Sequence, residues 1–366
     1  MPHRPGTTTT IKHIAHYTGY SFSTVAKALA NDAAIKPSTR KVIAEAAVRL
    51  NYYPNRLAQG LRRRKARTIG VVLNDLTNPF YAEIYKAIDT VARAKGYTMI
   101  LSDSDFDQER ERENISAMIS QGVEGIIVSA VSEDLQNLEV LEAYGIKLVI
   151  VDCKPKRNNY SYVYVDHELA ASEAVEHLVS NGHDRILLLN GPSKLSSSRQ
   201  FERGYAKVLR SHGIAFDSRL VLNMHLTIDA GHKTIRDMLS IRHCRTTEKD
   251  PGVSRTLNDF TAIVALSDLL ALGAYKAAIE SGFKIPDDYS VVGYDNIFAA
   301  PFLSPPLTTV NQPKELTGKS SINLLFDLIE GKRTKPERLI LRPELVIRQS
   351  VQSIRKLDSR SKTTSR

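Results

Sequence analysis

Carboxylate, amide and aromatic side chains follow several apolar runs in the second, larger part of this 366-residue chain. Carboxylates bind sugar hydroxyls well, and aromatic rings stack on sugar or base rings. Individually these residues have plainer interpretations, because Asp268 and Ser198 also suit helix caps and Phe80 also suits a core position. As a set they predict a ligand-binding cleft. The candidates are Asn74, Phe80, Tyr81, Asp152, Arg199, Phe201, Asp268 and Asp295.

Apolar runs and amphipathic helical patterns alternate over residues 68–352 and must position these side chains. Such alternation predicts doubly wound parallel sheets, in which ligands bind beyond the carboxyl ends of the strands. The strands are too many for one compact layer, and the pattern restarts after about Asp166. We therefore expect two α/β lobes with a cleft between them: lobe one at about 68–165 and 312–338, and lobe two at about 166–311 and 339–352.

The expected strands are 69–73, 98–101, 125–128, 147–151, 185–189, 262–266 and 290–292. The expected helices lie near 79–94, 107–121, 134–144, 168–181, 199–212, 229–240, 268–281 and 314–330.

A second kind of chemistry is indicated near the N-terminus, between Thr10 and Asn31. Ala15, Gly19 and Val25 have the spacing of a helix-turn-helix: a small residue lets the helices approach, a glycine allows the turn, and an apolar residue holds the second helix. The N-cap of that helix is expected at Ser21. An ordinary αα-hairpin in a globular core is the alternative.

If the stretch is a helix-turn-helix, Phe22, Ser23 and Lys27 point outward and reach base edges in the major groove of DNA. The charge distribution favours this interpretation. Residues 1–67 hold 13 Lys/Arg and two Asp/Glu, a net charge of +11, whereas the whole chain carries +10, so residues 68–366 carry −1. A basic module on a near-neutral body is typical of nucleic-acid binders.

A third helix is predicted over 37–50, which completes a DNA-binding domain at 10–54 after a disordered N-terminus at 1–9. Residues 55–67 combine a short helical stretch, NRLAQGL, with a basic run. A helix of this length is unstable alone. Its exposed Leu61 beside positive charge suits a minor groove, where leucine can part a base step. A plain flexible linker is the alternative. Residues 353–366 form a basic tail.

Several other classes of protein are disfavoured by the sequence. No run of about 18 apolar residues exists, so no helix is expected to span a membrane. The N-terminus lacks the apolar segment of a signal peptide, and the two cysteines form no disulfide framework, so a cytoplasmic protein is expected. We find no dinucleotide fingerprint and no nucleophile elbow, and His13 and His16 have no third metal ligand nearby. We therefore expect no enzyme, no cofactor and no metal.

Together these motifs resemble those of the lactose-repressor (LacI/GalR) family of bacterial transcription regulators. The resemblance covers about residues 10–350 and rests on four stretches: TIKHIAHYTGYSFSTVAKALAN, LNYYPNRLAQGL, SVVGYDN and PPLTTVNQP. It implies an all-α helix-turn-helix headpiece joined by a hinge helix to a two-lobed α/β core like periplasmic binding proteins. It also implies a homodimer that regulates transcription, most often as a repressor on operator DNA near the nucleoid.

The resemblance also implies a small-molecule effector, often a carbohydrate, whose binding in the core changes the affinity for the operator. Release of the operator is the commoner response in the family. A sugar-binding transport receptor without DNA function is the alternative, but it would need a signal peptide and no basic headpiece.

By match to the family's motifs, Phe22, Ser23 and Lys27 fall where operator bases are read, and Thr24 and Asn31 where phosphates are contacted. Leu61 falls where paired hinge helices wedge the operator centre. The full set of DNA-binding candidates is Thr10, Ser21, Phe22, Ser23, Thr24, Lys27, Asn31, Asn55, Arg56, Ala58 and Leu61. Phe80, Tyr81, Asp152, Asp268 and Asp295 fall on or beside the effector pocket.

The chain departs from the family pattern at several positions. His13 stands where an acidic residue is common, and Lys27 where an arginine is common. Lysine lacks the bidentate fork that reads guanine well, so a different base preference is expected. Phe201 stands where the family usually has a pocket arginine, and Arg199 lies two residues earlier. The effector is therefore expected to differ from the common sugars.

Two further segments bear on assembly. Residues 242–259 are polar and are predicted to form a surface insertion without a role in the pocket. The tail lacks leucine heptads, so a tetramerisation helix is not expected and a dimer is predicted.

Overall fold

The computed structural model describes residues 9–52, 67–157, 159–245 and 260–354. By their internal contacts, residues 1–66 and 67–366 form two compact units. The candidates Asn55, Arg56, Ala58 and Leu61 and most of the predicted insertion lie outside the described residues, as do the predicted disordered N-terminus except Thr9 and the tail beyond residue 354.

The first unit contains three helices, α1 (Ile11–Thr18), α2 (Phe22–Leu29) and α3 (Pro37–Arg49). Gly19 ends α1 with a φ of 74°, a left-handed conformation that glycine adopts without steric cost. The Ser21 hydroxyl then caps α2 by accepting from the Thr24 N–H at 3.1 Å. The small core consists of Ile14, Val25, Ala28, Ile43, Ala46 and Ala47. The predicted helix-turn-helix and third helix are thus present.

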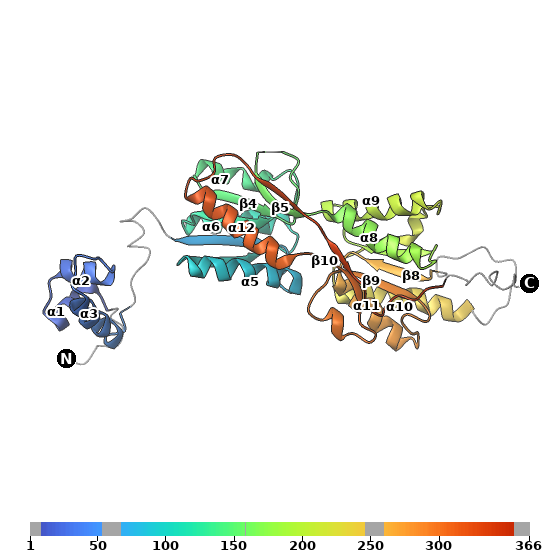
Figure 1. Ribbon diagram of the computed structural model, residues 1–366, viewed down its shortest axis with the longest axis horizontal. Coiled ribbons are helices and arrows are strands. Elements are labelled where there is room, and N and C mark those ends of the chain that lie inside the picture. Colours follow the sequence, from blue (N-terminus) through green and yellow to red (C-terminus); the bar gives the residue numbers. More distant parts are fainter. Residues whose placement is uncertain (1–8, 53–66, 158, 246–259, 355–366) are drawn as a thin grey trace, which may run out of the picture. The chain divides into compact units, whose positions relative to one another are not determined.

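The second unit contains two six-stranded sheets (Figure 1). The first is wholly parallel in the order β11-β5-β4-β3-β1-β2. Its strands are β1 (Thr68–Leu73), β2 (Thr98–Asp103), β3 (Gly125–Ser129), β4 (Lys147–Val151), β5 (Ser161–Val165) and β11 (Arg338–Leu341). One face packs on α5 (Pro79–Ala94) and α12 (Lys314–Ile329). The other face packs on α6 (Gln108–Ser120), a 3-10 turn at Gln136–Leu138 and α7 (Val140–Ala143).

The second sheet has the order β12-β10-β9-β8-β6-β7, in which only β12 runs antiparallel to its neighbour. Its strands are β6 (Ile186–Asn190), β7 (Val221–Asn223), β8 (Ala262–Ala265), β9 (Ser290–Asp295), β10 (Thr308–Asn311) and β12 (Glu344–Val346). One face packs on α10 (Ile228–Arg245) and α11 (Asp268–Glu280). The other packs on α8 (His167–Ser180) and α9 (Ser196–Ser211). Short 3-10 turns occur at Ser218–Leu220 and Ala300–Phe302.

The chain crosses between the two lobes after β5, after β10 and after β11. Because β11 pairs with β5 over Arg338–Leu341, the last crossing follows Leu341, a few residues beyond the boundary expected at 338. The predicted doubly wound architecture with two lobes is confirmed. Seven of the eight helices predicted for this unit are present as α-helices near their predicted positions, but the one expected near 134–144 is divided into the 3-10 turn at Gln136–Leu138 and the four-residue α7. None of the described helices combines the length and the hydrophobicity of a membrane-spanning segment.

Candidate functional site

One side of α2 is exposed and carries the residues predicted to meet DNA. Val25 and Ala28 are buried against the other helices, which turns Phe22, Ser23 and Lys27 to the outside. Phe22 is 49% exposed, so its ring is available for contacts outside the unit. Thr24 is half-buried, with its hydroxyl 2.9 Å from that of Ser21, and Asn31 is exposed with a φ of 57°. This helix therefore presents polar, apolar and cationic groups together.

The start of α1 explains one departure from the family pattern. Thr10 is the N-cap, and its backbone N–H donates to Nδ1 of His13 at 3.2 Å. A side-chain acceptor at this position closes a capping box. His13 thus supplies with an imidazole nitrogen the acceptor that a carboxylate would otherwise supply, and the first helix keeps its cap.

A cleft lies between the lobes, at the carboxyl ends of β1, β3, β4, β6, β8 and β9. Its volume is about 50 Å³, small beside the roughly 300–1,000 Å³ of ordinary ligand sites. The lobes are therefore close together in this structure, and a ligand needs them to part or reorient. The polar and aromatic lining residues are Asn74, Asp75, Asn78, Phe80, Tyr81, Phe106, Asp152, His167, Ser196, Ser197, Ser267, Tyr294, Asp295 and Gln312.

Asp152 stands at one side of this cleft, directly after β4, with a φ of 56°. The Tyr81 hydroxyl donates to its Oδ2 at 3.0 Å, while Nε2 of His167 lies 3.7 Å from its Oδ1. Nδ1 of His167 lies 2.6 Å from the hydroxyl of Tyr294. These four side chains link the two lobes, since Tyr81 and Asp152 belong to the first and His167 and Tyr294 to the second.

Burial determines the protonation states of Asp152 and His167. It raises the pKa of Asp152 to about 7, with the Tyr81 hydrogen bond opposing the rise. It lowers the pKa of His167 to about 4, so the imidazole is neutral at physiological pH. The carboxyl group consequently has no cationic partner and keeps its proton over a much wider pH range than an exposed aspartate does.

We expect Asp152→Asn to change how stability depends on pH. The folded-state pKa of Asp152 is about 7 and its ordinary value is 3.8. Between these values the unfolded chain ionises first, so wild-type stability falls as pH rises through this window. The amide cannot ionise, so the variant's melting temperature should gain on wild type between pH 4 and pH 8. One pKa unit corresponds to about 1.4 kcal/mol of stability. We therefore expect the difference between the melting temperatures of the variant and the wild type to change by more than about 4 °C over this pH range. A difference that stays constant with pH would contradict the assignment.

Asp295 stands at the end of β9, across from Asp152, with a φ of 114°. Ser267 donates to its Oδ2 at 3.1 Å, and the Gln312 amide donates to its Oδ1 at 2.7 Å. Burial, and then the neighbouring Asp268, raise the pKa of Asp295 well above its ordinary value. The backbone carbonyl of Asp295 also accepts from Nζ of Lys314 at 2.7 Å. Because Gln312 lies in the crossing segment before α12 and Lys314 begins that helix, Asp295 is tied directly to a connection between the lobes.

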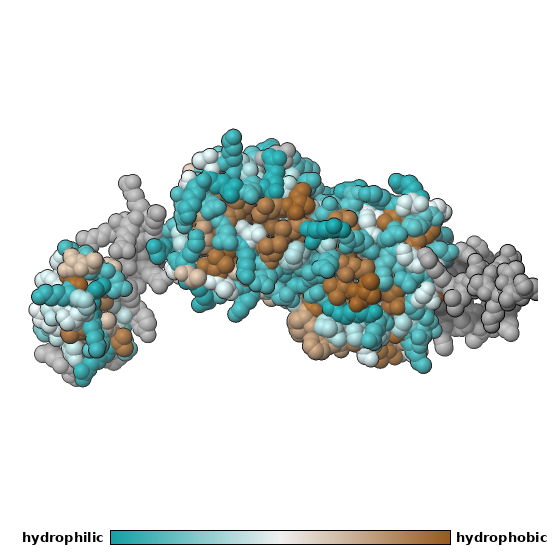
Figure 2. Space-filling model, in the orientation of Figure 1, coloured by the Kyte–Doolittle hydropathy of each residue, from teal (hydrophilic) through white to brown (hydrophobic). Residues whose placement is uncertain are grey.

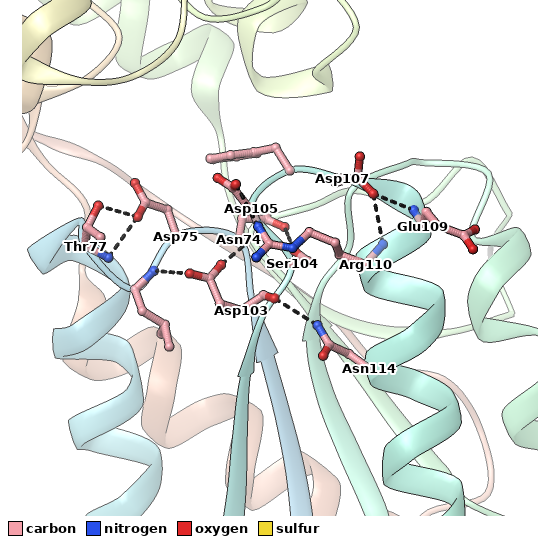
Figure 3. Close-up of polar contacts among 12 residues, drawn as sticks. Asn74, Asp75, Thr77, Asp103, Ser104, Asp105, Asp107, Glu109, Arg110 and Asn114 are labelled. Carbon is pink, nitrogen blue, oxygen red and sulfur yellow. Dashed lines mark hydrogen bonds and ion pairs between the residues drawn. The ribbon is translucent and has the colours of Figure 1, made fainter.

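Asn74 lies beside a hydrogen-bonded polar loop at the carboxyl ends of β1 and β2 (Figure 3). Its amide donates to Ser129 at 2.8 Å and its oxygen accepts from Ser104 at 2.9 Å. The nearby carboxylates have structural partners: Asp107 caps α6, and Asp105 pairs with Arg110 at 2.7 Å (Figure 3). In the described residues, no group of three side chains is arranged to hold a metal ion.

Three of the predicted cleft residues do not line it. Asp268 is fully buried behind the wall, where it accepts from Thr309 at 2.6 Å and from the Ile297 N–H at 2.8 Å. Phe201 is also fully buried, with its ring 5.4 Å from that of Tyr294. Arg199 lies at the rim, where it pairs with Glu133 of the first lobe.

The structure brings Asn74, Phe80, Tyr81, Asp152 and Asp295 together in the cleft. It adds His167 and Gln312, which sequence reasoning did not single out. Both residues belong to stretches that the sequence analysis had already noted for other reasons. His167 follows Asp166, where the strand and helix pattern restarts, and Gln312 lies within the PPLTTVNQP motif.

Models of two protein families match the chain. One, for bacterial regulatory proteins of the lacI family, matches residues 10–55. The other, for periplasmic binding proteins and the sugar binding domain of the LacI family, matches residues 66–349. The chain belongs to the LacI family. The matched ranges contain the three-helix unit and nearly all of the two-lobed unit, so both parts contribute to this assignment.

Individual LacI-family relatives match over nearly the whole chain. The transcriptional repressor PurR of Photobacterium profundum is 29% identical over 347 residues, covering 94% of this chain and 99% of the relative. The repressor CytR of Escherichia coli is 29% identical over 355 residues, covering 95% and 98%. These relatives are repressors rather than enzymes, in agreement with the sequence analysis.

Solved structures of LacI-family regulators are also similar to this chain. The lac repressor dimer bound to operator and the anti-inducer ONPF superimposes with a TM-score of 0.78 at 28% identity, covering 94% of this chain and 100% of that one. The complex of transcriptional regulator CelR with cellobiose gives a TM-score of 0.68 at 27% identity, covering 93% and 99%.

Proposed function

We propose that this chain is a homodimeric, cytoplasmic repressor that binds operator DNA through its helix-turn-helix and changes its affinity when a small effector occupies the cleft. The observation that carries the proposal is the exposed face of α2, where Phe22, Ser23 and Lys27 stand free beside a buried core. A repressor acts where the bacterial chromosome lies, so we expect the protein to be found at the nucleoid. Relatives named as repressors over the same length support this.

A dimer is supported by the surface of the second lobe. Phe298 and Phe302, in the loop after β9, are 69% and 83% exposed. Figure 2 shows apolar residues gathered at the lower edge of this lobe, where Figure 1 draws that loop in orange. Large exposed apolar groups close together are typical of protein interfaces. A second copy of the chain is the natural occupant, since the similar lac repressor structure is a dimer.

Two headpieces in one dimer would meet two half-sites of an operator, so the operator should be a near-palindrome. The effector can change operator affinity only if it binds the two arrangements of the lobes with different affinity. The contacts of Lys314 provide a physical link: this buried side chain joins the carbonyls of Asp295 and Asn296 to α12 of the first lobe. A ligand that moves Asp295 therefore acts directly on a crossing segment.

Operator selection tests the DNA-binding role. The full chain should select a near-palindromic sequence from random DNA and bind it about 10³-fold or more tightly than unrelated DNA. Lys27→Ala should weaken binding to that sequence about 10- to 100-fold, because a base contact contributes about 1–3 kcal/mol.

Lys233→Ala is the matched control, since Lys233 is exposed on α10 of the second lobe and the charge change is the same. It should leave operator affinity unchanged. Equal effects of the two variants, or no selected sequence at all, would argue against the proposed function.

A further inference from the structure

The described walls of the cleft contain no lysine and no arginine. They do contain the carboxyl groups of Asp75, Asp152 and Asp295. His167 is the only basic side chain among these lining residues, and burial lowers its pKa to about 4, so it carries no charge near neutral pH. A ligand entering this cleft therefore meets acidic and neutral groups and no positive charge.

Two deeply buried atoms in the same walls have no hydrogen-bond partner within the described structure. They are Oε1 of Gln312 and Nε2 of His167, and both side chains are only 2% exposed. Oδ1 of Asp152 lies 3.7 Å from that His167 nitrogen, which is too long for a hydrogen bond. Unpaired buried polar atoms are costly, so a ligand that completes them gains affinity. The amide oxygen of Gln312 accepts a hydrogen bond and so favours a donor on the ligand. Nε2 of His167 donates or accepts according to the tautomer, and a hydroxyl on the ligand suits either role.

Three cations near the cleft are engaged elsewhere. Nζ of the exposed Lys194 donates to the backbone carbonyl of the lining residue Phe106 at 3.4 Å. Arg199 donates to the carbonyls of Ser193 and Lys194 at 3.0 and 2.7 Å, besides its pair with Glu133. Lys314 is fixed by the carbonyls of Asp295 and Asn296, and its Nζ lies 3.6 Å from Glu83. None of the three can turn into the cleft without giving up these contacts.

The position at which the family usually has a pocket arginine also supplies no charge here. Phe201 occupies it, fully buried among apolar residues of the second lobe and edge-on to Tyr294. An aromatic ring cannot make the bidentate contact that a guanidinium makes with a carboxylate or phosphate. The loss of that arginine is thus not compensated by another cation in the cleft walls.

We propose that the effector is a ring compound that bears several hydroxyl or amine donors and no anionic group, and that the cleft rejects phosphorylated and carboxylated forms of the same compound. This rests on the proposed function of the cleft as the effector site. Moving a phosphate or carboxylate from water into a buried site costs several kcal/mol unless a cation or a set of donors replaces its hydration. The aspartates of this cleft would add repulsion whenever they are ionised.

Matched pairs of compounds test this on the full chain. The uncharged arm holds pentoses, hexoses, disaccharides and nucleosides; the anionic arm holds their phosphates and the corresponding uronic acids. Thermal unfolding finds ligands, because binding to the folded state raises the melting temperature. Titration calorimetry then compares each ligand with its anionic twin. Free sugars and nucleosides both offer uncharged rings with hydroxyl or amine donors. Which of the two classes contains the ligand shows which kind of compound the cleft binds.

We expect at least one uncharged compound to bind and its anionic twin to bind at least about 100-fold more weakly, a difference of about 2.7 kcal/mol. An anionic twin that binds equally or more tightly overturns the proposal. So does a panel in which no uncharged compound binds.

A variant makes the test independent of ligand strength. Asp152→Asn keeps the shape of the side chain and, above the Asp152 pKa of about 7, removes a negative charge. At pH 8 it should therefore narrow the ratio of the dissociation constants of the anionic twin and the uncharged ligand about tenfold. Asp287→Asn, at an exposed site in the loop before β9, should leave the ratio unchanged. An unchanged ratio in Asp152→Asn contradicts the proposal.

Operator binding by the same preparation distinguishes a failure of the proposed charge selection from a failure of the proposed function. If an anionic compound binds and alters operator affinity, the proposed function stands and the charge selection fails. If the chain selects no operator, the proposed function fails whatever the ligand panel shows.

Discussion

Asp295→Asn is expected to abolish the response of operator binding to the effector while the variant still binds the operator. Asp295 lines the cleft, accepts from Ser267 and Gln312, and is joined through its backbone to Lys314. The amide removes an acceptor for the ligand and forces its own N–H₂ toward one of two donors, so the link between ligand and crossing segment is broken. Fluorescence anisotropy on labelled operator, with and without effector, measures both properties; we expect the effector-induced change in Kd to fall from about tenfold or more to none.

The control for this experiment is again Asp287→Asn, an exposed carboxyl in the loop before the same strand. It should respond to effector as wild type does. The melting temperature of Asp295→Asn must show that the variant is folded. A folded variant with a normal response would remove Asp295 from the effector site.

Phe302→Asp is expected to convert the dimer into monomers and to weaken operator binding about 100-fold or more. The side chain is 83% exposed, so the monomer loses little on substitution. In the proposed interface, however, a buried unpaired carboxylate is strongly unfavourable. The second headpiece then no longer binds as part of the same molecule, and the gain from bivalent binding, about 10²–10⁴-fold, is lost. Analytical ultracentrifugation gives the assembly state and anisotropy gives the affinity.

Ile340→Asp provides a matched control, because Ile340 is 55% exposed on β11 of the first lobe and the chemical change is similar. It should stay dimeric and keep its operator affinity. A dimeric Phe302→Asp protein would show that the copies associate through another surface.

The sequence predicted the helices well and the shorter strands poorly. Helices such as α5 and α12 have strong apolar periodicity and lie where expected. The strands at 161–165, 221–223, 308–311, 338–341 and 344–346 were not predicted. β10 is an example: its threonines at 308 and 309 are fully buried, but their hydroxyls bond to Arg348 and Asp268. Polar residues satisfied by distant partners cannot be recognised from local hydrophobicity.

The residues of the cleft could be predicted only in part from the sequence. Carboxyl ends of parallel strands meet at one edge, so Asn74, Asp152 and Asp295 could be grouped from the strand pattern alone. Whether a side chain near such an end faces the cleft or the packing behind it depends on rotation of the local backbone. Asp268 begins a helix and turns to Thr309, whereas Asp295 has a φ of 114° and faces the cleft.

The most direct measurement of the central claim is the affinity of the full chain for its selected operator as a function of effector concentration. We predict that Kd changes about tenfold or more and that the change saturates at the concentrations at which the same effector raises the melting temperature. A ligand that binds the cleft and leaves operator affinity constant at saturation would contradict the coupling of the two parts.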